Sequence, residues 1–205
     1  VLSGYYQHYF ETVSGFRLWS NGLDGLHGAA VEVDHAIPVV PKKLVVESFR
    51  TDYQGGPYHD LGEFGEPDTL LFGQQTYYQN SAYRSGWTYL GRMIGPPLIM
   101  TSGDAEDLRI ASNRIRALHL GISGDISDAL SYRFLWTGAA HRDPTRYTFD
   151  PIPISGSTWQ YDTLLEFQIN EPFDIERLDA SVGVAHTFGD LEDFSMGFIA
   201  EVHYR

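Results

Sequence analysis

The most constraining feature of this chain is a pair of long runs, between residues 113 and 140, in which apolar and polar residues alternate. In the second run every other residue is apolar from Leu130 to Trp136, and polar residues such as Arg133 stand between them. Successive side chains of a β-strand point to opposite faces, so this alternation predicts two strands that each have an apolar and a polar face. A turn is predicted between them at 124–128, where Gly, Asp and Ser favour turn geometry.

The same alternation recurs in three later runs, at 161–169, 178–184 and 194–204. With their flanking residues the runs are about ten to thirteen residues long, whereas a globular strand commonly has about five or six. A tilted strand needs about nine to eleven residues to cross a bilayer. The pattern therefore predicts an all-β antiparallel meander with strands long enough to span a membrane.

The first half of the chain carries a rougher form of this pattern. Strands are expected at 16–19, within 26–37, at 43–54, and as a pair at 71–79 and 86–94 across a turn at 80–84. A helical turn is expected around 104–110.

The lengths of the predicted connections alternate along the chain. Long connections are predicted at 55–70, 95–112 and 141–157, and short ones at 38–42, 80–84, 124–128 and 171–176. The connection at 189–193 breaks the rule, because it is short but falls among the long ones. Outer-membrane barrels have short turns at the periplasmic end and long loops outside. The sequence thus favours a single domain over 1–205, a transmembrane outer-membrane β-barrel with Arg205 at the short-turn end.

Composition excludes several other classes of protein. The 205 residues include 21 Gly, 10 Pro and 14% aromatic residues, which suits an all-β protein with many turns. A net charge of −13 disfavours binding to nucleic acid and to anionic lipid surfaces. The chain has no cysteine for a disulfide or a thiolate metal site, and no apolar run as long as a transmembrane helix. Val1 does not open a signal peptide, so we expect a mature form or part of a longer protein.

Three segments carry a resemblance to a known family. They are Trp-Thr-Tyr-Leu-Gly-Arg-Met-Ile-Gly-Pro-Pro-Leu at 87–98, Asn-Arg-Ile-Arg-Ala-Leu-His-Leu-Gly-Ile-Ser-Gly at 113–124 and Ser-Tyr-Arg-Phe-Leu at 131–135. In residue type, order and spacing they resemble the Wzi-type capsule-assembly family of outer-membrane proteins, over about 87–136. The resemblance implies a β-barrel in the bacterial outer membrane that helps attach or organise surface polysaccharide without breaking bonds. That family's chains are longer, so the resemblance also implies that this chain is the C-terminal part of a larger barrel.

Candidate glycan-binding residues come from the polar faces, the strand ends and one loop. If the apolar faces meet lipid, the barrel lumen is lined by Arg133, Asp162, Glu166, Gln168, Glu201 and His203. Trp159 stands near a strand end, where an aromatic ring serves either a membrane interface or sugar stacking. In the loop at 141–147, Arg142 and Arg146 suit acidic sugars, because guanidinium pairs with carboxylate through two hydrogen bonds.

No enzyme chemistry is indicated. The carboxylates of Asp162 and Glu166 share a strand face, but their backbones are about 13 Å apart, which does not suit a glycosidase pair. No nucleophile elbow, phosphate loop, metal-ligand spacing or cofactor motif is present. The expected partners are outer-membrane lipid, surface polysaccharide and other envelope proteins. Two alternatives stay open: a soluble secreted β-sandwich that binds carbohydrate, and a general porin or polysaccharide-export channel.

Overall fold

A computed structural model provides the fold of the chain. It describes residues 1–9, 23–35, 37–51, 54, 77–78, 83, 85–104, 108–141, 158–172 and 175–204. No helix in the described part of the chain is long and apolar enough to cross a membrane.

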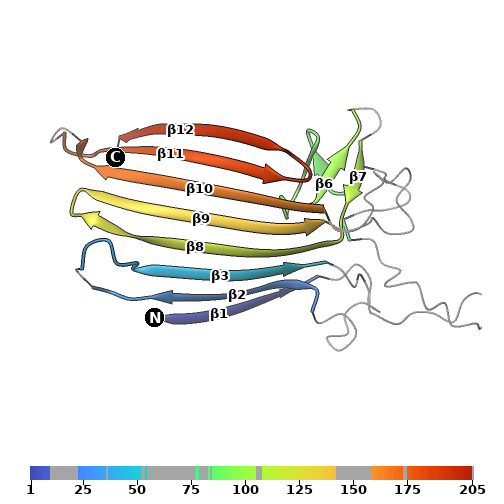
Figure 1. Cartoon of the computed structure of the whole chain (residues 1–205), viewed down its shortest axis with the longest axis horizontal. Helices are drawn as coiled ribbons and strands as arrows, with labels where there is room; N and C mark the ends of the chain where they lie inside the picture. Colours follow the sequence, from blue (N-terminus) through green and yellow to red (C-terminus); the bar gives the residue numbers. More distant parts are fainter. Residues whose placement is uncertain are drawn as a thin grey trace, which may run out of the picture.

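Eight of the strands form one antiparallel sheet in the order β1-β2-β3-β8-β9-β10-β11-β12 (Figure 1). They are β1 (Leu2–His8), β2 (Gly25–Glu32), β3 (Lys43–Arg50), β8 (Ile115–Ser127), β9 (Leu130–His141), β10 (Thr158–Asn170), β11 (Leu178–Gly189) and β12 (Phe194–Tyr204). Each strand pairs with the strands before and after it, so the sheet is the predicted meander. It is an open sheet, in which β1 and β12 are the two edges.

The register gives the sheet two chemically different faces. Phe134 pairs with Leu165, Leu165 with Val184, and Val184 with Phe198, so one apolar row crosses four strands. We call the side that carries this row the apolar face. The opposite side, the polar face, holds every Asp, Glu and Lys of the eight strands, a division that follows from the two-residue period of each strand.

The two ends of the sheet differ in their connections, as predicted, except that the predicted short turn at 80–84 and the long connection at 95–112 both fall within the single connection 51–114 between β3 and β8. The strand ends joined by the connections 9–24, 51–114, 142–157 and 190–193 lie at one end of the sheet, here called the loop end. The strand ends joined by the connections 33–42, 128–129 and 171–177 lie at the other, here called the turn end. Both Val1 and Tyr204 lie at the turn end, where Figure 1 marks the two termini.

The buried core lies on the polar face at the loop end. Its members are Phe49, Ile99, Ile110, Ile115, Ala117 and Ala139. Two small hairpins belong to this end: β4 (Thr88–Tyr89) with β5 (Arg92–Met93), and β6 (Met100–Ser102) with β7 (Arg109–Ser112). Ile99 and Ile110 come from this hairpin region, so it packs on the polar face.

Several sequence predictions need correction. The turn predicted at 124–128 is shorter, because β8 continues to Ser127 through a bulge between Asp125 and Ser127. The strand predicted at 86–94 is instead the β4–β5 hairpin, whose turn residues Leu90 and Gly91 have φ of 48° and 81°. Positive φ at both central residues is the geometry of a tight hairpin turn, which the alternation does not reveal.

The predicted helical turn at 104–110 is also wrong over its described part, where β7 begins at Arg109. Strand β1 was not predicted. The strand expected at 16–19 and residues 71–76 of the strand at 71–79 lie outside the described residues, while Tyr77 and Tyr78 are in a turn. Most of the predicted turn at 80–84 also lies outside them.

Candidate functional site

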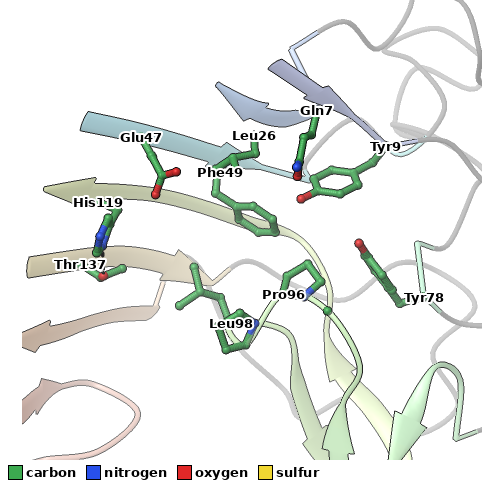
Figure 2. Close-up of a pocket in the computed structure, with 12 residues that line it drawn as sticks. Gln7, Tyr9, Leu26, Glu47, Phe49, Tyr78, Pro96, Leu98, His119 and Thr137 are labelled. Carbon is green, nitrogen blue, oxygen red and sulfur yellow. Dashed lines mark hydrogen bonds between the residues drawn. The ribbon is translucent and has the colours of Figure 1, made fainter. Parts of the chain in front are cut away.

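The polar face holds a cavity of about 530 Å³ at its loop end, which we call the loop-end cavity (Figure 2). Its floor consists of side chains from β1, β2, β3, β8 and β9. Its other wall is the segment 95–98, Gly-Pro-Pro-Leu, which precedes the core residue Ile99. The residues that line it are Gln7, Tyr9, Leu26, Glu47, Phe49, Tyr78, Gly95, Pro96, Pro97, Leu98, His119 and Thr137.

One side of the loop-end cavity is aromatic. The ring of Tyr9 meets the ring of Phe49 edge-on at a centroid distance of 5.8 Å, and that of Tyr78 edge-on at 6.1 Å. Burial raises the pKa of Tyr78 to about 12, with a further contribution from Tyr9. Burial also raises the pKa of Tyr9, and the negative charge of Glu47 adds to the effect. Both phenols therefore stay protonated at neutral pH and keep their O–H donors.

The other side of the loop-end cavity is polar. The hydroxyl of Tyr5 donates a hydrogen bond to Oε1 of Glu47, which fixes the position of that carboxylate. The Nδ1 atom of His119 and the Oγ1 atom of Thr137 are hydrogen-bonded at 2.8 Å. The two-residue period of a strand puts these side chains on one face. Glu47 lies two positions before Phe49 on β3, so both side chains project from the polar face.

A second cavity of about 330 Å³, the turn-end cavity, lies nearer the other end of the polar face. Arg133 lines it and forms an ion pair with Glu166 at 2.6 Å. Lys42 pairs with Asp125 at 2.5 Å, and this hydrogen bond raises the pKa of the Lys42 ammonium. The Arg133 side chain is 53% exposed, so its pair with Glu166 contributes little to stability, about 0–1 kcal/mol.

The candidate residues Arg133 and Trp159 do not share a binding surface. Arg133 projects from the polar face, whereas Trp159 lies on the apolar face at the loop end, stacked on Tyr161 at 6.2 Å. Arg142 and Arg146 lie outside the described residues.

The six residues predicted to share one polar face do so. Within this set, Glu166 binds Arg133, while Asp162 accepts a hydrogen bond from Thr187 at 2.7 Å. The carboxylates of Glu166 and Asp162 are therefore held by neighbours on the next strands, whereas that of Glu201 pairs with His203 on its own strand at 3.1 Å.

The loop-end cavity was missed at the sequence level. Its floor residues are spread over five strands, and only the register brings them together. The one local signal was the pair Pro96 and Pro97, which follows the β4–β5 hairpin. Proline has no backbone N–H to donate, so these residues do not continue a paired strand. Comparison with protein-family models, curated proteins and solved structures finds no match to this chain.

Proposed function

We propose that this chain forms part of an outer-membrane β-barrel that binds surface polysaccharide without cleaving it, as the resemblance to the Wzi-type capsule-assembly family implies. The observation that carries the proposal is the composition of the apolar face together with its exposure. Phe198 is 76% exposed, Val202 70% and Tyr204 75%, and all three lie on this face. On the eight described strands this face carries no Asp, Glu or Lys, and its two arginines, Arg50 and Arg116, lie at the loop end. An apolar face this open to its surroundings suits contact with lipid.

The height of the apolar face supports the proposal. On β12 the apolar face runs from Phe194 to Tyr204, ten residue steps. These steps correspond to about 33 Å of strand. At the tilt of about 35–45° found in outer-membrane barrels, that length spans about 25 Å along the membrane normal, the usual height of the apolar band.

Aromatic residues gather where such a band would meet water. At the loop end of the apolar face, Tyr161 stacks on Trp136 at 6.2 Å and on Phe188 at 5.0 Å, in addition to its contact with Trp159. Tyr204 lies at the turn end. Amphipathic rings are enriched at both interfaces of a membrane, so this placement suits the proposal.

The proposal requires partners for the sheet edges. An open edge in lipid would leave backbone N–H and C=O groups without hydrogen bonds, which is costly. The family that the chain resembles has larger barrels, and additional strands between β12 and β1 would complete the sheet. The polar face would then line the interior, where its cavities and side-chain donors and acceptors suit a hydrated polysaccharide.

The first test is electrophoretic mobility in SDS with and without boiling, on protein extracted from an outer-membrane fraction. We expect a requirement for detergent and a faster band in the unboiled sample, because a closed barrel resists SDS until it is heated. Solubility without detergent and no shift would overturn the membrane assignment and favour a soluble carbohydrate-binding sandwich. Ion conductance in a planar bilayer, without glycan binding, would favour a porin instead.

A further inference from the structure

We propose that the loop-end cavity binds one ring of a neutral glycan and rejects acidic sugars. This inference rests on the proposed function and names the part of the polar face that contacts the polysaccharide. The volume of about 530 Å³ falls within the range of about 300–1,000 Å³ that small-molecule sites occupy.

The walls of the cavity match the two surfaces of a sugar ring. A pyranose has C–H faces that pack on aromatic rings and an edge of hydroxyl groups that both donate and accept hydrogen bonds. The cavity offers the rings of Tyr9 and Tyr78 on one side (Figure 2). On the other side lie the carboxylate of Glu47 and the side chains of His119 and Thr137 (Figure 2).

The charge of the cavity sets its specificity. Among the described residues that line it, Glu47 is the one carboxylate, and none is Arg or Lys. A phenol is neutral at neutral pH, so the hydroxyls of Tyr9 and Tyr78 add no charge of their own. A uronic acid would bring a second carboxylate close to Glu47, and the described lining offers no Arg or Lys to lie between them, which disfavours binding. This expectation is the reverse of the acid-sugar role predicted for Arg142 and Arg146.

The turn-end cavity serves as an internal comparison. It holds both signs of charge, and two ion pairs, Arg133 with Glu166 and Lys42 with Asp125, lie in its lining. Aromatic side chains form a wall in the loop-end cavity, whereas Tyr132 is the one aromatic residue described in the turn-end cavity. The stacking surface that a sugar ring requires is therefore a property of the loop-end cavity.

The test measures oligosaccharide binding to the full chain in lauryldimethylamine oxide, a detergent without a sugar head group. The probes are maltotetraose, cellotetraose and α-1,6-mannotetraose, which are neutral, and tetragalacturonate, which is acidic and of the same length. We expect at least one neutral probe to bind, with tetragalacturonate weaker by at least about tenfold in Kd. Saturation-transfer NMR and calorimetry are suitable readouts.

Three variants locate the binding. Leu98→Trp places a larger side chain into the cavity, and we expect it to raise the Kd of the neutral probe on the order of tenfold. Glu47→Gln keeps an acceptor for the Tyr5 hydroxyl and removes the negative charge. It should therefore reduce the difference in Kd between the neutral probes and tetragalacturonate. Gln168→Ala, in the turn-end cavity, is the matched control and should bind like the wild type.

The outcomes separate this inference from the proposed function. Two results would overturn the cavity assignment: glycan binding that persists in Leu98→Trp, and equal binding of acidic and neutral probes. Neither result bears on the barrel itself, which the heat-dependent mobility shift tests separately. Competition by the detergent itself would also overturn the cavity assignment, in favour of an acyl-chain site. If Leu98→Trp no longer shows the mobility shift, it is not folded and its binding cannot be interpreted. The test then rests on Glu47→Gln, and a preference for neutral probes that is unchanged in this variant refutes the inference.

Discussion

Replacing Phe198 with arginine tests whether the apolar face contacts lipid. Phe198 is in the row with Phe134, Leu165 and Val184, close to the middle of β12, and its side chain is 76% exposed. If that exposed surface faces water, the exchange costs within about 0.5 kcal/mol, as for other surface substitutions. If it faces the middle of a bilayer, Arg costs about 2–4 kcal/mol. The two environments therefore differ by several times the usual error of an unfolding measurement.

Two matched substitutions on the same strand control for the change of residue. Phe194→Arg is at the loop end of β12, where the side chain is 64% exposed and the cost in a membrane falls to about 0–1 kcal/mol. Ile199→Arg is next to Phe198 but projects from the polar face, where its side chain is 40% exposed. We expect Phe198→Arg to lower the free energy of unfolding most, and Phe194→Arg and Ile199→Arg to lower it by similar, smaller amounts.

The assay is urea unfolding of the chain refolded into phospholipid vesicles, followed by the fluorescence of its four tryptophans. The free energy of unfolding is compared among the three variants and the wild type at equal lipid concentration. Equal costs for Phe194→Arg and Phe198→Arg, both below about 0.5 kcal/mol, would refute the assignment of the apolar face to lipid. A large cost for all three would instead indicate that β12 is covered by protein on both faces.

Three further predictions concern the polar face and its edge. A double-mutant cycle of Arg133→Ala and Glu166→Ala should give a coupling below about 1 kcal/mol, and a larger value would mean that the ion pair is more buried than its exposure indicates. The pKa of Tyr78 is raised from 10.0 to about 12, so the folded state keeps the phenol proton longer than the unfolded chain and stability should fall from pH 10 to 12. Alkaline unfolding monitored by circular dichroism should show a smaller fall in Tyr78→Phe, and an identical pH profile would exclude Tyr78 as the cause. A Cβ on Gly28 would lie 2.1 Å from the far end of the exposed Tyr5 ring, so Gly28→Ala should turn that ring away from Glu47 and lower stability by about 0.5–1.5 kcal/mol, the contribution of one hydrogen bond, whereas an unchanged melting temperature would contradict this packing.

The long strands were predictable from sequence because most of their apolar residues recur at every second position. The alternation from Leu130 to Trp136 and from Phe194 to Tyr204 places every residue on the face that the register then confirms. Strand β1 was missed because Gly4 interrupts its apolar side, which also includes the polar His8. Its partner β2, rather than its own residues, determines its course.

The candidate site was less predictable than the strands. Its residues belong to separate strands, and Glu47 and His119 become neighbours only through the pairing of β3 with β8. The path of Leu98 over the polar face depends on packing against the buried cluster that includes Phe49 and Ala117, which is long-range in the sequence. Periodicity carries no information about such contacts.

The location of the core links the stability of this chain to its surroundings. The buried hydrophobic cluster lies on the polar face at the loop end, next to the cavity, and consists of six buried residues. The larger apolar surface, which includes Phe198 and Val202, is on the opposite face and stays exposed in the described structure. Contiguous exposed apolar surface of this kind is characteristic of a contact with lipid or with another protein, and burying it contributes about 25 cal/mol per Å². We therefore expect the sheet to gain most of its stability from what covers the apolar face, while the small core fixes the shape of the cavity.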